Sequence, residues 1–168
     1  MQHKRLLAAI AAAGVVSLAV APGTAAPPRG GLLVPGVSLG GVRLGMTGGE
    51  VLAAWGRRHG VCRNCERPTW YFNYAPFAPE GAGVSFRGGR VAHVFTVWKA
   101  AGWRTVEGLE LGARDDDAGE RLVILDDRRC DGYTARIAAG PAGRSVLYLF
   151  RGEVWGFGLV RRGLDPCL

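Results

Sequence analysis

The chain has 168 residues, of which 48% are apolar and 21% are charged, and its formal net charge is +7. This length suffices for one domain with a substantial core or for two small fused units. Arginine pairs are scattered rather than clustered on one element, which argues against a nucleic-acid-binding protein. These pairs are Arg57-Arg58, Arg128-Arg129 and Arg161-Arg162.

The N-terminus has the three-part layout of a secretory signal peptide. The basic start MQHKR precedes an apolar run over residues 6–21. Gly23 and Ala25 provide the small side chains that signal peptidase requires, which predicts removal of residues 1–25 and a mature chain that begins at Ala26. The apolar run is shorter than the ~20 residues of a membrane span. We therefore expect a secreted or extracytoplasmic protein of the cell envelope with a net charge of +5 and no stable membrane anchor.

Three sequence landmarks occur twice in the same order. GVRLG at 41–45 resembles GLELG at 108–112, GGEVL at 48–52 resembles AGERL at 118–122, and FRGGRV at 86–91 resembles FRGEV at 150–154. Similarity that preserves order predicts two copies of one supersecondary unit. We expect an N-terminal segment and first repeat over residues 26–105, and a second repeat over residues 106–168.

Each repeat is predicted to begin with a helix. Thr47 and Glu50, like Asp117 and Glu120, stand three residues apart as in a capping box. An apolar stripe follows each start. The stripe residues are Val51, Leu52 and Trp55 before Gly56 in the first repeat, and Leu122, Val123 and Leu125 in the second.

Extended segments rich in β-branched and aromatic residues follow each helix. Gly88-Gly89 and Arg151-Gly152 are predicted tight turns. The expected strands cover residues 69–74, 83–87 and 90–98 in the first repeat, and residues 133–138, 145–150 and 153–160 in the second. The predicted fold class is therefore α+β, with two tandem repeats of one helix and three antiparallel strands, and with both helices on one face of the sheet.

The motif LGMTGGEVLAAWG at residues 44–56, with Cys62 six residues after it, resembles a helix start found in two families. These are the β-lactamase inhibitory proteins and the outer-membrane assembly lipoproteins called SmpA or BamE. The resemblance implies a secreted binding scaffold in which tandem units of one helix and antiparallel strands each have their own disulfide. It transfers no inhibitor contact residue to a position of this chain, and the acylated cysteine of the lipoproteins has no counterpart here.

Four cysteines in an exported chain predict two disulfides. Cys62, Cys65, Cys130 and Cys167 allow three pairings, and closure of each repeat on itself would join Cys62 to Cys65 and Cys130 to Cys167. A thioredoxin-like role for the CRNC sequence is disfavoured because this sequence follows a helix instead of starting one. A zinc site of all four cysteines would need long gaps without a pattern.

The residue pattern predicts no catalytic, metal or cofactor site. His59 lies at a predicted helix end and His93 on a predicted core strand, and the serines occur in no nucleophile motif. The acidic residues 115–117 are explained by the preference of a helix N-terminus for negative charge, although a calcium site is an alternative.

The two hairpins differ in their face patterns. In the first, the turn pairs Val84 with His93 and Phe86 with Val91, so that one face forms a core while the other is polar. The core face consists of Val84, Phe86, Val91, His93, Phe95 and Val97. In the second hairpin both faces are apolar. The segment 31–40, a second protomer or a ligand must therefore cover one of them.

We expect a secreted, non-enzymatic module that binds a protein or ligand, with inhibition as one form of that activity. If Phe150 points inward like Phe86, the opposite face of its hairpin is a candidate interface, including one for a homodimer. That face carries Leu147, Leu149, Val154 and Val160. Further candidate contacts, chosen as arginine and aromatic residues in loops, are Arg67, Trp70, Tyr71, Tyr74, Trp103 and Arg104. The alternatives are a structural protein of the cell envelope and a thiol-redox or hydrolytic enzyme.

Overall fold

The computed structural model describes residues 28, 30–62, 64–72 and 81–168. The first half of the fold contains β1 (Gly31–Val34), β2 (Ser38–Leu39), α1 (Gly48–Trp55), β3 (Gly60–Cys62), β4 (Thr69–Phe72), β5 (Gly81–Arg87) and β6 (Arg90–Val97). The second half contains β7 (Trp103–Thr105), α2 (Asp115–Arg121), β8 (Ile124–Arg129), β9 (Thr134–Ala138), β10 (Arg144–Phe150) and β11 (Glu153–Val160). The predicted signal peptide lies outside the described residues.

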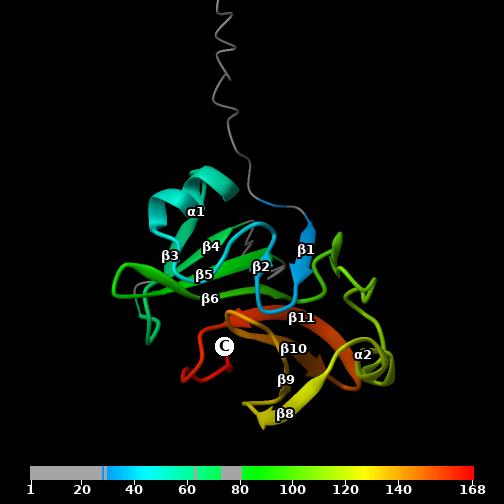
Figure 1. The fold of residues 1–168 in the computed structure, drawn as a ribbon. Helices are drawn as coiled ribbons and strands as arrows, with labels where there is room; N and C mark the ends of the chain where they lie inside the picture. Colours follow the sequence, from blue (N-terminus) through cyan, green and yellow to red (C-terminus); the bar gives the residue numbers. More distant parts are fainter. Residues whose placement is uncertain (1–27, 29, 63, 73–80) are drawn as a thin grey trace, which may run out of the picture.

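Most of these elements are strands in two sheets (Figure 1). The large sheet has eight strands in the order β3-β4-β5-β6-β11-β10-β9-β8, and all its neighbours are antiparallel. The small sheet has the order β2-β1-β7, in which β1 and β7 run parallel. The prediction of an α+β fold with one helix and three strands per repeat is therefore wrong.

The missed strands β3 and β8 are the two edges of the large sheet. β8 has the sequence ILDDRR and is exposed from Leu125 to Arg129, while β3 has only three residues. Edge strands are commonly short or charged, because these features prevent pairing with other chains. Such strands lack the apolar alternation by which the inner strands were found. Each half of the large sheet thus has four strands, and its helix is short.

The first helix start is confirmed, and the second is wrong. Thr47 caps α1 through a complete capping box with Glu50, and Gly56 ends the helix. α2 begins at Asp115, before the predicted cap, and Arg114 at its N-cap makes no side-chain hydrogen bond. The expected apolar stripe of the second helix lies beyond its end and at the start of β8.

The two halves nevertheless attach their helices to the sheet in the same way. The loop before each helix exchanges two backbone hydrogen bonds with the first part of the last strand. These bonds are Gly45 N–H to Val91 O and Val91 N–H to Met46 O in the first half, and Gly112 N–H to Val154 O and Val154 N–H to Ala113 O in the second. β6 and β11 then pair at the centre of the sheet, where Phe95 lies opposite Gly158.

A β-bulge changes the predicted face of each hairpin. Phe86 pairs with Val91 as expected, but Ser85 rather than Val84 pairs with His93, because Ala92 is an extra residue. Trp155 is the extra residue in the second hairpin, where Leu149 pairs with Val154 and Tyr148 with Gly156. Because a bulge adds one residue to a strand, the side chains beyond it point to the opposite face of the sheet from the one that simple alternation predicts. His93 therefore lies on the face opposite the predicted one.

The sequence FRG at residues 86–88 does not occupy the same structural positions as FRG at residues 150–152, but is shifted by one residue. Counted from the turns and bulges, Phe86 corresponds to Leu149, and the exposed Arg87 corresponds to Phe150. Phe150 is accordingly 36% exposed. The predicted exposure of Leu147, Leu149, Val154 and Val160 is wrong, since all four are buried.

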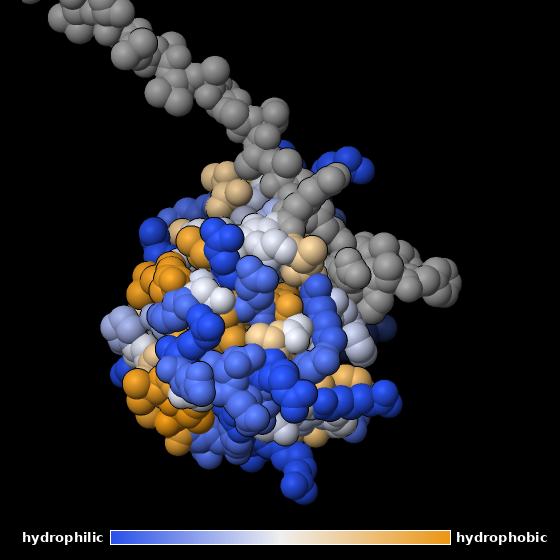
Figure 2. Space-filling view, turned by 90° about the vertical axis from the view of Figure 1, so that its right-hand side faces the viewer, coloured by the Kyte–Doolittle hydropathy of each residue, from blue (hydrophilic) through white to orange (hydrophobic). Residues whose placement is uncertain are grey.

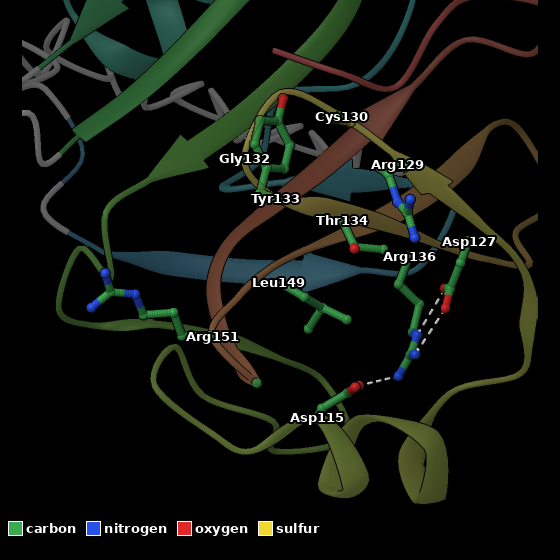
Figure 3. Close-up of a pocket in the computed structure, with 11 residues that line it drawn as sticks. Asp115, Asp127, Arg129, Cys130, Gly132, Tyr133, Thr134, Arg136, Leu149 and Arg151 are labelled. Carbon is green, nitrogen blue, oxygen red and sulfur yellow. Dashed lines mark hydrogen bonds and ion pairs between the residues drawn. The ribbon is translucent and has the colours of Figure 1, made fainter.

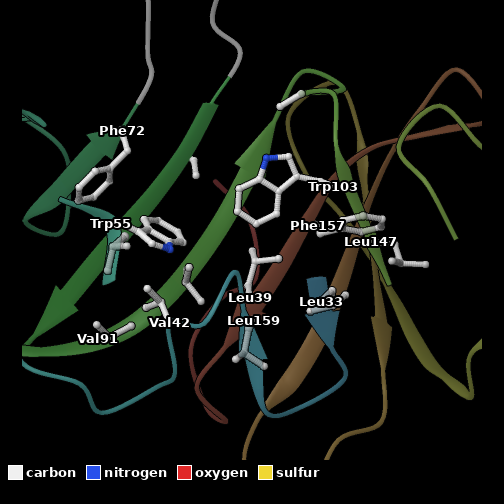
Figure 4. Packing of buried hydrophobic residues seen from close by; sticks show 14 of the residues in the cluster. Leu33, Leu39, Val42, Trp55, Phe72, Val91, Trp103, Leu147, Phe157 and Leu159 are labelled. Carbon is white, nitrogen blue, oxygen red and sulfur yellow. The ribbon is translucent and has the colours of Figure 1, made fainter. Parts of the chain in front are cut away.

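Both faces of the large sheet are covered. On one face, α1, α2 and the N-terminal segment share a core with the sheet strands, and Leu33 and Leu39 lie close to Leu147, Phe157 and Leu159 (Figure 4). Of the three covers considered for the second hairpin, the segment 31–40 thus occupies this face. The opposite face has a second core, whose buried members are Phe95, Val97, Ala135, Val146, Tyr148, Trp155 and Val160, with Leu164 of the C-terminal tail packed against them.

Disulfides join Cys62 to Cys65 and Cys130 to Cys167, which leaves no free cysteine. Of the three pairings that four cysteines allow, the structure has the one in which each half closes on itself. The second bridge holds the C-terminal tail against the end of β8, and Pro166 O accepts a hydrogen bond of 3.2 Å from Tyr148 Oη. Two disulfides fit an oxidising compartment.

Candidate binding site

Among the aromatic and arginine candidates, Arg67 and Trp70 line one groove, and Arg67 also lines a cavity on the opposite face together with Tyr71. Tyr71 follows Trp70 on β4 and therefore lies on the opposite face, partly buried against the second core. Trp103 is a core residue, only 2% exposed, and packs against Trp55. Arg104 is exposed on the small sheet, and Tyr74 lies outside the described residues.

The groove that contains Trp70, called here the Trp70 groove, has a volume of about 520 Å³. Its lining comes from the start of α1, from the loop that follows the Cys62–Cys65 disulfide, and from the first hairpin. The lining residues are Gly48, Glu66, Arg67, Pro68, Trp70, Phe86, Arg87, Gly88 and Gly89. Arg67 and Trp70 were candidates from the sequence, and Phe86, predicted in the core, is buried and also borders the groove.

Trp70 is held between two other rings. Its ring centroid lies 4.4 Å from that of His59, in a stacked arrangement, and 4.6 Å from that of Phe86, in an edge-to-face arrangement. His59 is itself fixed, since its Nδ1 lies 2.9 Å from Arg57 O. Gly48 is required beside this cluster, because a Cβ atom there would lie 2.7 Å from Trp70 Cη2. The indole is therefore positioned before any partner arrives.

Positive charge borders the aromatic surface. Arg67 is partly buried and Arg87 is exposed, and neither forms an ion pair with another described residue. Glu66 is the single acidic residue of the lining. A half-buried tryptophan between two free guanidinium groups has the composition of an interface anchor.

The second half of the molecule contains an equivalent groove of about 400 Å³ (Figure 3). Strand register gives the correspondence. Leu149 replaces Phe86, Arg136 replaces Trp70, and the turn Arg151-Gly152 replaces Gly88-Gly89. Asp115, the first residue of α2, replaces Gly48, the first residue of α1.

Ion pairs organise this second groove. Arg136 donates from Nε and Nη2 to the two carboxylate oxygens of Asp127 at 2.9 Å, and from Nη1 to Asp115 (Figure 3). The hydrogen bond from Arg136 lowers the pKa of Asp127, and the same bond raises the pKa of Arg136. The groove that is aromatic in the first half is thus crossed by a charged network in the second.

The difference between the two grooves shows which side chains the shared fold does not require. The second half builds the same helix-to-hairpin frame with arginine and aspartate at positions where the first half has tryptophan and glycine. The frame therefore does not require aromatic rings there. Figure 2, which faces the side on which α2 lies, shows mainly hydrophilic surface across the centre, with hydrophobic residues gathered toward one margin.

A third cavity, of about 320 Å³, lies on the opposite face beside the C-terminal tail. Burial lowers the pKa of His93 in its wall to about 3, so the imidazole is neutral, and its Nε2 lies 2.6 Å from Tyr148 Oη. Ser85 Oγ lies 2.8 Å from Thr69 Oγ1. No hydrogen bond joins Ser85 to His93, so this cavity lacks a paired serine nucleophile and base.

Neither a metal-binding cluster nor a membrane-spanning helix occurs in the described part of the chain. Among those residues, no group of histidine, cysteine, aspartate or glutamate side chains is arranged to hold a metal ion. None of the helices there has the length and apolar character needed to span a membrane.

Comparison with known proteins gives a likeness of fold. No family model matches the chain, and no curated protein matches its sequence. A solved structure of an extracellular protein containing a SCP domain, from Bacillus anthracis str. Ames, is similar with a TM-score of 0.51 and 12% sequence identity. The match covers 71% of this chain and 44% of that chain, so this protein corresponds to less than half of the other.

Proposed function

We propose that the protein is an extracellular binding module that holds a protein partner in the Trp70 groove. The observation that carries this proposal is the contrast between the two equivalent grooves. The second half forms the same frame with Arg136 and Asp115 at the positions of Trp70 and Gly48. The first half instead has Trp70 and Phe86 beside Arg67 and Arg87, which form no ion pair with another described residue.

The chemistry of the groove indicates the kind of partner. An apolar or aromatic side chain would pack on the surface that Trp70 and Phe86 form together, and carboxylates beside it would pair with Arg67 and Arg87. Tryptophan and arginine are the residue types that most often dominate binding energy. The partner segment is therefore an exposed apolar residue flanked by acidic residues.

Three observations support an extracellular location. Both disulfides favour an oxidising compartment, the N-terminal sequence has a signal-peptide layout, and the similar solved structure is of an extracellular protein. The resemblance of residues 44–56 to inhibitory and envelope-assembly families is compatible with such a binding scaffold. Mass spectrometry of the exported protein tests the location, with a mature chain that begins at Ala26 as the expected result.

Affinity capture of a partner from the extracellular fraction of the producing cells tests whether the Trp70 groove is a binding site. Immobilised mature protein is expected to retain a partner, and Trp70→Ala and Arg87→Glu are each expected to weaken the measured Kd at least about tenfold. Trp98→Ala and Arg104→Glu change the same residue types at exposed positions outside the groove and serve as matched controls. Equal binding by all five proteins would refute the groove as the contact surface.

A further inference from the structure

A second aromatic surface lies at the far end of the sheet face opposite the helices. Trp98, Tyr133, Phe150 and Trp155, called here the aromatic corner, form a continuous set of rings. Trp98 lies 5.3 Å from Trp155 and 6.4 Å from Phe150 between ring centroids, and Tyr133 lies 5.4 Å from Trp155. These residues do not line the Trp70 groove.

The outer rings of the corner are open to solvent. Trp98 is 50% exposed and Phe150 36% exposed, whereas Trp155 is 8% exposed and forms the floor. Scattered exposed apolar residues are ordinary on protein surfaces. A half-exposed tryptophan packed at a tilt against a buried one is different, because the lower ring restricts the orientation of the upper ring.

The backbone holds Trp98 in an unfavourable conformation. Trp98 has φ 60° and Lys99 has φ 52°, in the left-handed region that bulky residues rarely adopt. A backbone hydrogen bond of 2.6 Å from Lys99 N to Trp155 O and the ion pair between Lys99 and Glu153 fix this turn. The turn projects the indole outward, and backbone strain retained at a non-glycine residue points to a functional role.

Hydrogen-bonding groups border the corner. Lys99 follows Trp98 in the sequence, and Glu153 pairs with Phe150 across the hairpin. The guanidinium of Arg151 lies 5.1 Å from the Phe150 ring centroid. The indole Nε1–H of Trp155 is buried and has no hydrogen-bond partner among the described groups. The surface thus combines flat apolar rings with charged donors and acceptors at its rim.

We propose that the aromatic corner binds a glycan of β-1,4-linked pyranose units. In such sugars the substituents and the glycosidic bonds are equatorial, so each ring face presents axial C–H groups and the chain is extended. The axial anomeric bond of an α-1,4 linkage instead curves the chain, so that successive rings cannot lie along one flat surface. These faces can stack on the Trp98 indole, while the equatorial hydroxyls reach Lys99, Glu153 and Arg151. A protein partner would instead bury the charged rim, where Lys99 and Glu153 already form an ion pair.

Isothermal titration with soluble oligosaccharides tests the proposal. The probes are chitohexaose and cellohexaose, both β-1,4-linked, with the α-1,4-linked maltohexaose for comparison. We expect saturable binding of at least one β-linked probe and no binding of maltohexaose at the same concentration. Absence of binding by both β-linked probes at millimolar concentration, or equal binding of maltohexaose, would overturn the proposal.

Variants assign the binding to the corner. Trp98→Asn removes the ring and places a residue that tolerates the left-handed conformation, so it should preserve or raise thermal stability while reducing affinity at least about tenfold. Phe150→Ser is the second variant and should also weaken binding, whereas Trp98→Tyr should retain most of it. Unchanged affinity in both Trp98→Asn and Phe150→Ser contradicts the assignment.

Trp70→Ala separates this inference from the proposed function. The variant should bind the β-linked probe as the wild type does, because Trp70 lies in a different groove. A loss of glycan binding in Trp70→Ala with retention in Trp98→Asn would place the glycan in the Trp70 groove and overturn both assignments.

Discussion

At the scale of single residues, the core on the sheet face opposite the helices encloses a few polar groups among its aromatic rings. His93 is 1% exposed and lies 2.6 Å from Tyr148 Oη, and the Tyr148 ring lies over Gly156 and Gly158. The absence of side chains at Gly156 and Gly158 therefore makes room for the side chain of Tyr148.

The buried imidazole makes stability dependent on pH. Burial lowers the folded-state pKa of His93 from 6.5 to about 3. Between these values the unfolded chain binds a proton that the folded protein does not, so stability is complete above pH 6.5 and falls as the pH decreases toward 3. The full effect is on the order of 5 kcal/mol. Urea denaturation at several pH values should show this loss, and His93→Gln should flatten it, whereas an NMR titration of folded His93 near pH 6.5 would contradict it.

The packing of Tyr148 on glycine gives a second prediction. A Cβ atom on Gly158 would lie 2.5 Å from Tyr148 Oη, which is hydrogen-bonded to Pro166 O and placed beside His93. Gly158→Ala should displace this hydroxyl and lower the free energy of unfolding by about 2 kcal/mol. Gly60→Ala is the matched control, because Gly60 is also a strand glycine without a positive φ and an added Cβ there meets nothing within 4 Å. Equal thermal stability of Gly158→Ala and the wild type would refute the contact.

At the scale of elements, the two halves use one frame with different local chemistry. The first helix has a complete capping box from Thr47 and Glu50, while Arg114 at the equivalent position of α2 provides no cap. Both helices nevertheless start at the same point relative to the hairpin, because the preceding loops form matching backbone bonds to Val91 and Val154. Attachment to the sheet therefore determines where α2 begins.

Because only α1 has a side-chain cap, substitutions at the two N-cap positions should change the stability in opposite directions. Thr47→Ala should reduce stability by about 1 kcal/mol, because Glu50 N–H loses its acceptor. Arg114→Thr should increase it by roughly 0.5–1 kcal/mol, since a hydroxyl would then be available to Asp117 N–H at the third helical position. Chemical denaturation of both variants measures the two changes in the free energy of unfolding. Stabilisation by Thr47→Ala or destabilisation by Arg114→Thr would be inconsistent with this account.

The sequence identified the inner elements well and the edges poorly. The capping box of α1 and the strands β4, β5, β6, β9, β10 and β11 follow from local patterns. The face assignments failed because one bulged residue, Ala92 or Trp155, reverses the alternation and leaves no signal in composition. Among the site residues, Arg67 and Trp70 could be selected by type. Phe86 and Arg87 could not, because their place in the groove depends on the packing of α1 against the hairpin.

At the scale of the whole molecule, both faces of the eight-stranded sheet are covered by the chain itself. The N-terminal segment and the helices cover one face, and the C-terminal tail held by the Cys130–Cys167 disulfide packs on the other. Packing within the chain therefore accounts for most of the apolar residues on both sides of the second hairpin. The contacts proposed above with other molecules lie in the Trp70 groove and at the aromatic corner.

This arrangement predicts the outcome of a charge on the inner hairpin. Leu147 is fully buried in the core close to Leu33 of the N-terminal segment (Figure 4). Leu147→Glu would bury a carboxylate without a partner, and the loss of several kcal/mol should unfold the protein. Circular dichroism at 25 °C measures this directly. A folded Leu147→Glu protein that had only lost self-association would contradict this account.

The central claim is that the two halves share one frame and that the chemistry of the first groove alone makes it a binding site. The most direct test transfers the chemistry of the second groove into the first through the double variant Gly48→Asp and Trp70→Arg. The added aspartate side chain is tolerated because the indole that would lie 2.7 Å from its Cβ is removed. Binding of the captured partner is then measured together with thermal unfolding. The account predicts a folded protein that no longer binds the partner, and partner binding at wild-type affinity by the folded double variant would contradict it.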